Sequence, residues 1–79
     1  MKIFGYDKKG SSELLELSEV TFQIKANELK NVISFFQHVE REMEIHGKDF
    51  GHEHYKDYAE KISDNYDIII ISDAEAVLE

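Results

Sequence analysis

The chain has 79 residues and a mass of 9.2 kDa, a length that suits one domain. It contains neither cysteine nor proline, so we expect no disulfide and no thiolate metal site. No apolar run reaches the roughly 18 residues of a membrane-spanning helix, and the opening residues lack the apolar stretch of a signal peptide. We therefore expect a folded cytoplasmic domain.

Acidic residues are concentrated in the second half of the chain. Seventeen acids against nine bases give a formal net charge of −8. Residues 1–39 hold five acids and five bases, whereas residues 40–79 hold twelve acids and four bases. Such a surface repels nucleic acid, whose affinity comes from Lys and Arg on phosphates, and it attracts a basic partner. Solubility is the alternative reason for the acidity.

The first 25 residues have the pattern of β-structure. Met1–Tyr6 predicts a strand, and the Gly- and Ser-containing stretch Asp7–Ser12 predicts the turn of a hairpin. In Glu13–Lys25 the apolar residues alternate, but they switch from odd to even positions partway. This switch predicts one long strand with a bulge near Ser18-Glu19, or two strand segments joined by a kink.

A long amphipathic helix is predicted over Glu28–His46. Asn27 is suited to be its N-cap, and Gly47 is suited to end it. Phe35 lies at the margin of the apolar stripe and Ile45 nearly opposite its centre, so something other than the sheet is expected to cover at least one of them. The stripe consists of Leu29, Val32, Ile33, Phe36, Val39 and Met43.

The remaining residues predict a polar connection, a short helix, a turn and a strand. Lys48–His54 is the connection, a helix is expected over about Glu53–Ile62, and Ser63–Asn65 marks a turn. Asp67–Ser72 contains four consecutive isoleucines and is the clearest strand. The expected fold is therefore α+β, with a small, mainly antiparallel sheet of three to four strands, one long helix and one short helix.

The four isoleucines place apolar side chains on both faces of the sheet. One long helix covers only one face. The short helix, the C-terminal tail or another subunit must cover the other, so a homodimer or a partner complex is a further expectation.

Histidines and acids between positions 46 and 57 form one weak candidate for a metal site. His52 and His54 share a face if the segment is extended, and His46 or Asp57 could supply a third ligand. If Glu53 instead opens a helix, this geometry fails, and the histidines would cap and hydrogen-bond around the helix start. No nucleophile elbow or phosphate loop is present, so we expect no enzymatic activity and no cofactor.

Binding of a partner is the favoured function. Phe50, Tyr55 and Tyr58 interleave with acids, and buried aromatic rings dominate interface energetics. Packing of Tyr55 and Tyr58 in the core is the alternative interpretation. Acidic residues also crowd the C-terminal end of the long helix, where the helix dipole disfavours negative charge. The candidate partner-binding residues are Glu40, Glu44, Asp49, Phe50, His52, Glu53, His54 and Tyr55.

Two short segments resemble one known family. Leu14–Thr21 (LLELSEVT) leading into an amphipathic helix, followed by Asp49–Tyr55 (DFGHEHY), resembles the immunity protein 32 family of bacterial polymorphic toxin systems. The resemblance covers roughly residues 1–58. It implies a cytoplasmic protein that binds and neutralises a cognate toxin domain without catalysis of its own. If the family's Gly-His-x-His stretch is functional, the matching positions are Gly51, His52 and His54.

Overall fold

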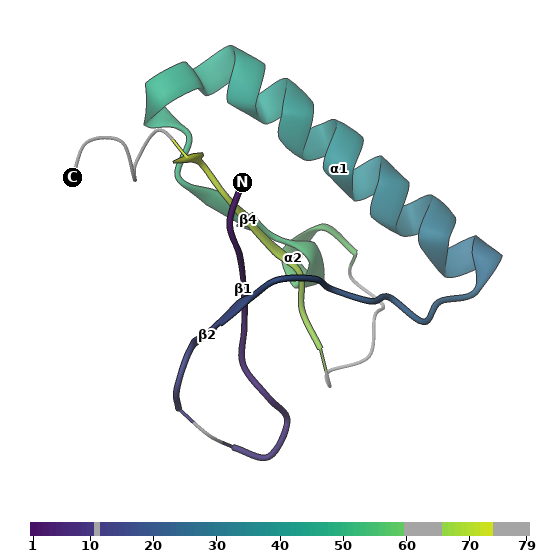
Figure 1. The fold of residues 1–79 in the computed structure, drawn as a ribbon. Helices are drawn as coiled ribbons and strands as arrows, with labels where there is room; N and C mark the ends of the chain where they lie inside the picture. Colours follow the sequence, from purple (N-terminus) through teal and green to yellow (C-terminus); the bar gives the residue numbers. More distant parts are fainter. Residues whose placement is uncertain (11, 60–65, 74–79) are drawn as a thin grey trace.

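A computed structural model describes residues 1–10, 12–59 and 66–73 of the chain (Figure 1). The α+β class is confirmed, with one long helix, one short helix and antiparallel strand pairs. The four strands among the described residues form two separate two-stranded sheets rather than one. The turn predicted at Ser63–Asn65 lies outside the described residues. The elements in chain order are β1 (Ile3–Gly5), β2 (Leu15–Leu17), α1 (Ala26–His46), the 3₁₀ helix η1 (Gly47–Asp49), β3 (His52–His54), α2 (Tyr55–Tyr58) and β4 (Ile69–Ile71).

The predicted N-terminal hairpin is confirmed. β1 pairs antiparallel with β2, with Ile3 opposite Leu17. In the connecting turn the Lys9 backbone N–H donates to Asp7 Oδ1 at 3.0 Å, and Gly10 adopts a φ of +85° that other residues avoid. The long bulged strand is wrong, because β2 ends at Leu17 and residues 18–25 join no strand ladder within the described part of the chain. An alternating pattern forms a strand only where a neighbouring strand completes its hydrogen bonds.

Helix α1 begins two residues earlier than predicted and ends where predicted. Lys25, in an extended conformation, is the N-cap residue, and its carbonyl accepts from the Leu29 N–H at 2.9 Å. Asn27 lies inside the first turn, where its Oδ1 accepts from the Glu28 N–H, so its assignment as the N-cap was wrong. Gly47 ends the helix with a φ of +52°, and its N–H donates to the Met43 carbonyl.

The core forms where α1 meets α2 and the β3–β4 sheet. Phe35 is completely buried, because the rings of Tyr55 and Tyr58 cover it at centroid distances of 5.3 and 5.6 Å. Helix α1 is therefore rotated about its axis, so that part of the apolar stripe expected to face the sheet is exposed. Ile45 remains uncovered, with an exposed fraction of 71%. The buried residues are Val32, Phe35, Val39, Phe50 and Tyr55, with Met43, Ala59, Ile68 and Ile70 packed against them.

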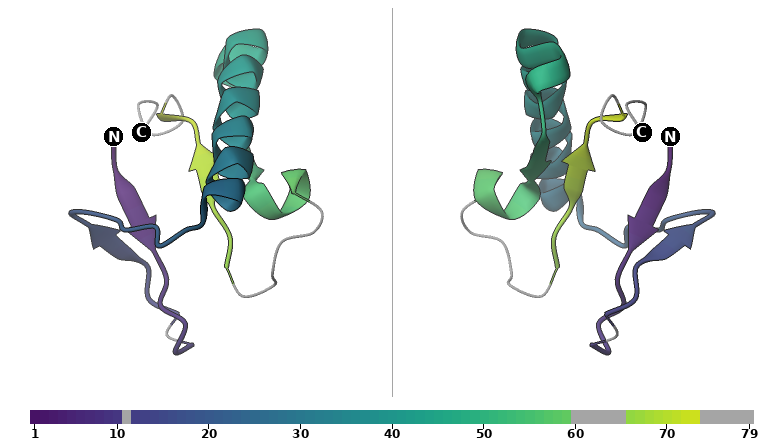
Figure 2. Two further views of the ribbon diagram at one scale, coloured as in Figure 1. Left: turned by 90° about the vertical axis from the view of Figure 1, so that its right-hand side faces the viewer. Right: turned by 90° about the vertical axis from the view of Figure 1, so that its left-hand side faces the viewer.

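The prediction that the isoleucine side chains lie on both faces of the sheet is confirmed. Ile68 and Ile70 pack against the core, while Ile69 and Ile71 are exposed. In both views of Figure 2 the β1–β2 hairpin lies on the side of β4 remote from α1. The hairpin makes few contacts with the other elements. No helix among the described residues is long and apolar enough to cross a membrane.

Candidate functional site

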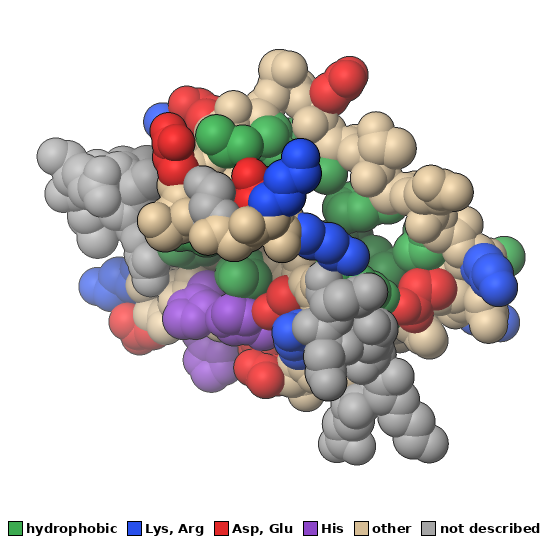
Figure 3. Space-filling view, turned by 90° about the horizontal axis from the view of Figure 1, so that it is seen from below, with side chains coloured by type: hydrophobic (Ala, Val, Ile, Leu, Met, Phe, Trp, Pro, Cys, Tyr) green, Lys and Arg blue, Asp and Glu red, His purple; other side chains and the backbone are tan. Residues whose placement is uncertain are grey.

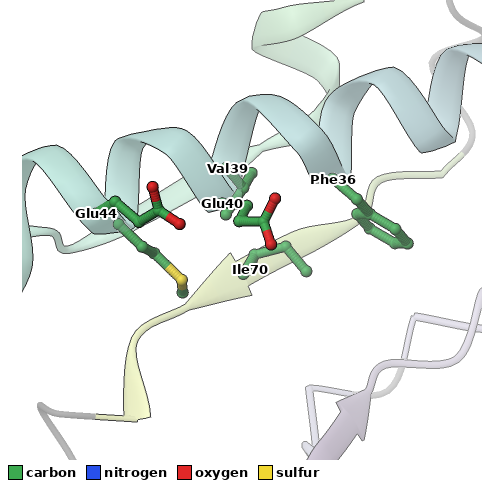
Figure 4. A pocket seen from close by; sticks show the side chains of 6 residues that line it. Phe36, Val39, Glu40, Glu44 and Ile70 are labelled. Carbon is green, nitrogen blue, oxygen red and sulfur yellow. The ribbon is translucent and has the colours of Figure 1, made fainter.

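An open, largely apolar groove of about 400 Å³ lies between α1 and β4 (Figure 4). The Val39 side chain is buried at its floor, whereas the Phe36 ring is 41% exposed. Figure 4 shows the carboxylates of Glu40 and Glu44 beside these apolar side chains, both carried by α1. The lining residues are Phe36, Val39, Glu40, Met43, Glu44 and Ile70.

The groove continues an uncovered apolar strip along α1. Ile33 and Leu29, one and two helical turns before the groove, are 47% and 44% exposed. The sequence predicted these positions and Phe36 as core, because their spacing follows the helical stripe. The structure instead turns Phe35 inward and leaves this strip without a cover among the described residues.

Glu40 and Glu44 are predicted site residues that the structure brings together. They lie one helical turn apart, a spacing at which like charges repel. Within the described residues neither carboxylate has an ion-pair partner. A cation placed between them would therefore gain attraction from both.

Three other predicted residues lie apart from the groove lining. Asp49 is exposed in η1, at the C-terminal end of α1. Phe50 and Tyr55 are core residues, with exposures of 5% and 0%, so their assignment to a partner surface was wrong. Both rings are buried because they pack in one cluster with the α1 residues Val32, Phe35 and Val39.

His54 is held by an acid close to the start of α2. Its Nδ1 lies 2.6 Å from Asp67 Oδ2, and Asp67 Oδ1 accepts from the backbone N–H groups of Lys56 and Ile68. Burial raises the pKa of Asp67, but the hydrogen bonds from His54, Lys56 and Ile68 outweigh it and hold the pKa below its ordinary value. This arrangement agrees with the expectation that His54 hydrogen-bonds around a helix start.

The proposed metal pair of His52 and His54 lacks a third ligand in the described residues. The two rings meet edge to face with centroids 5.2 Å apart, since both project from the same side of β3. His46 lies instead beside Glu42, with Nε2 3.9 Å from the carboxylate, and Asp57 is exposed on α2. In Figure 3 histidine side chains gather next to acidic ones on the face seen from below.

Glu53, on the opposite face of β3, points to a cluster that sequence reasoning missed. Its Oε2 lies 3.5 Å from His38 Nε2, and Glu42 completes a group of three side chains. The i, i+4 spacing of His38 and Glu42 on one helix was the available signal. Nothing in the sequence indicated that Glu53 would join them, because that contact depends on β3 packing beside α1.

A carboxylate at the first turn of α1 binds two tyrosines. Glu28 accepts hydrogen bonds from the hydroxyls of Tyr55, at 3.1 Å, and Tyr66. The Tyr66 hydrogen bond is the largest cause that lowers the pKa of Glu28, and in return Glu28 raises the pKa of Tyr66. Burial, followed by the hydrogen bond to Glu28, raises the pKa of Tyr55 to about 12. This network ties α1 to α2 and to Tyr66, whose ring is 37% exposed.

Comparisons of the chain with protein-family models, curated proteins and solved structures find no match. The interpretation of the groove therefore rests on its own geometry and charge.

Proposed function

We propose that this chain is a cytoplasmic protein that binds and inhibits a basic protein partner through the groove between α1 and β4. The observation that carries the proposal is an apolar groove whose rim bears two carboxylates, Glu40 and Glu44, without ion-pair partners among the described residues. By its resemblance to the immunity protein 32 family, the partner is a bacterial toxin domain that the chain neutralises.

The apolar lining favours an interface with a protein. Phe36 is 41% exposed in the groove, and Ile33 extends the exposed apolar surface along α1. Contiguous apolar surface with a polar rim is typical of a protein–protein interaction site. A partner side chain that fills the groove would remove Phe36 and Met43 from water.

The charge favours a basic partner. Residues 40–79 carry the whole net charge of −8, and two of their acids lie at the groove. A lysine or arginine of the partner would relieve the repulsion between Glu40 and Glu44 and speed the encounter at low salt. Toxins that cleave nucleic acid fit this requirement, because they need basic surfaces to bind phosphates.

The test begins with capture of the partner from the native host and its identification by mass spectrometry. The captured toxin domain is then purified, and its association with the chain is measured by stopped flow at low and high salt. Two double variants are compared: Glu40→Lys with Glu44→Lys, and Glu16→Lys with Glu19→Lys. Each moves the net charge from −8 to −4, but Glu16 and Glu19 are exposed away from the groove lining.

We expect the groove double variant to lower the association rate about tenfold or more at low salt and to lose protection against the toxin. The matched control should retain both. Equal effects of the two variants would mean that the acids act only through net charge, and would contradict binding at the groove. No effect of either variant, with no salt dependence, would exclude an electrostatic interface.

A structural homodimer that uses the same apolar strip is the main rival. Sedimentation across a range of concentrations distinguishes it, because a dimer closed over the groove would dissociate when Phe36 is replaced by Glu. A concentration-independent monomer that binds the toxin one to one would support the proposal. Metal binding by His52 and His54 is the other rival, and titration of the His52→Gln variant with Zn²⁺ tests it.

A further inference from the structure

We infer that His38, Glu42 and Glu53 form a binding site for a divalent transition-metal ion, with zinc as the best-fitting member. Their potential ligand atoms all lie within 4.8 Å of one another. The site lies apart from the groove and shares none of its lining residues. It also differs from the His52 and His54 pair considered from the sequence.

The fold assembles the three ligands from two elements. His38 and Glu42 lie one turn apart on α1, and Glu53 projects from the middle of β3. Phe50, shortly before β3, and Tyr55, directly after it, are both buried in the core. These two side chains therefore fix the position of Glu53 relative to α1. Ligands fixed by such packing need little reorganisation when an ion binds.

The distances are close to those of a coordinated ion. Ligands at about 2.0–2.1 Å in a tetrahedral zinc site are about 3.3 Å apart. His38 Nε2 and Glu53 Oε2 are already 3.5 Å apart. Small rotations of the Glu42 side chain, which is 30% exposed, would bring its carboxylate to the same centre. Water would fill the remaining coordination positions.

The charges of the three side chains also favour binding of a cation. Two carboxylates and one neutral imidazole sum to −2, which a divalent ion balances. Among the described residues the ion-pair partners of Glu42 and Glu53 are histidines, His46 and His38, rather than lysine or arginine. An imidazole ligand favours zinc and its transition-metal neighbours over Mg²⁺ or Ca²⁺, which prefer oxygen ligands alone.

A ring contact orients the imidazole. Tyr58 stacks on His38 with centroids 5.1 Å apart and an angle of 28° between the planes. Phe35, which is completely buried, contacts Tyr58 in turn. The His38 ring is 30% exposed, so an ion can reach it from solvent while the stacked tyrosine restricts its rotation.

The test is calorimetric titration of the tag-free protein with ZnCl₂ at neutral pH. The variants are His38→Gln, Glu42→Gln and Glu53→Gln, with His52→Gln as the matched histidine control. We expect one ion per chain, affinity lowered about 10- to 100-fold or more by each ligand variant, and unchanged affinity in the control. Circular dichroism of each variant establishes that its fold is retained.

Two further measurements keep the test decisive if the His38 variant fails to fold. Zinc should shift the imidazole nitrogen resonances of His38 but not those of His52, and it should raise the melting temperature of the wild type at pH 7 but not that of the Glu53→Gln variant. Absence of saturable zinc binding would overturn the inference. So would binding that His52→Gln abolishes or that the two glutamine variants of Glu42 and Glu53 leave unchanged.

Discussion

The imidazole of His54, the last residue of β3, lies against the carboxylate of Asp67, which comes shortly before β4. His54 Nδ1 and Asp67 Oδ2 are 2.6 Å apart. Asp67 also accepts the Lys56 N–H in the first turn of α2, so one carboxylate supports the β3–β4 pair and the start of the short helix. These contacts assign His54 a structural role and leave His52 as the exposed member of the pair.

Replacement of Asp67 by Asn should destabilise the fold by about 1–2 kcal/mol, because charge-assisted hydrogen bonds are lost. The folded pKa of Asp67 lies below its ordinary 3.8. Its contribution is therefore complete above about pH 4 and is lost as the pH falls through the folded value. Urea unfolding should show the difference from wild type in full at pH 7, and the difference should shrink as the pH is lowered below 3.8. Asp49→Asn, at an exposed site, is the control and should behave as wild type.

Replacement of Tyr55 by Phe should cost about 0.5–1.5 kcal/mol at pH 7, since the hydrogen bond to Glu28 is lost. The pKa of Tyr55 is raised from 10.0 to about 12, so its contribution is complete below pH 10 and is lost as the pH rises toward 12. Wild type should thus lose more stability than the variant between these pH values. An identical alkaline loss in both proteins would contradict the assignment. Tyr6→Phe, at a ring that is 66% exposed, provides the control.

Truncation of Phe35 to Ala should destabilise the protein by about 3–5 kcal/mol, because a completely buried ring is removed. That loss approaches the whole stability expected for so small a domain. Ile45→Ala, at a residue that is 71% exposed, should change the denaturation midpoint little. The opposite order of effects would mean that α1 is rotated about its axis in solution.

Replacement of Gly47 by Ala should cost about 1–2 kcal/mol through backbone strain. Its φ of +52° is unfavourable for a residue with a Cβ, although no atom lies within 4 Å of where that Cβ would stand. The cost is therefore conformational rather than steric. Thermal unfolding of this variant and of the exposed Lys48→Ala control measures it, and equal midpoints would show that α1 ends differently in solution.

Local signals were sufficient for α1, for the hairpin turn and for the isoleucine strand. The three- and four-residue spacing of apolar side chains, Gly47 and the β-branched run all act within a few residues along the chain. β3 was missed and taken for a polar connection. Its sequence His-Glu-His has no strand propensity, and only pairing with β4, some 17 residues later, makes it a strand.

The same distinction applies to the candidate sites. The sequence determined that acids gather in the second half and that Glu40 and Glu44 share a helix face. Tertiary structure decided that Phe50 and Tyr55 are buried, that Phe36 lines an open groove and that Glu53 meets His38. Spacing along one helix or strand fixes which side chains share a face. Which face becomes core depends on the rotation of α1 against residues far away in the chain, and that rotation is set by packing of whole elements.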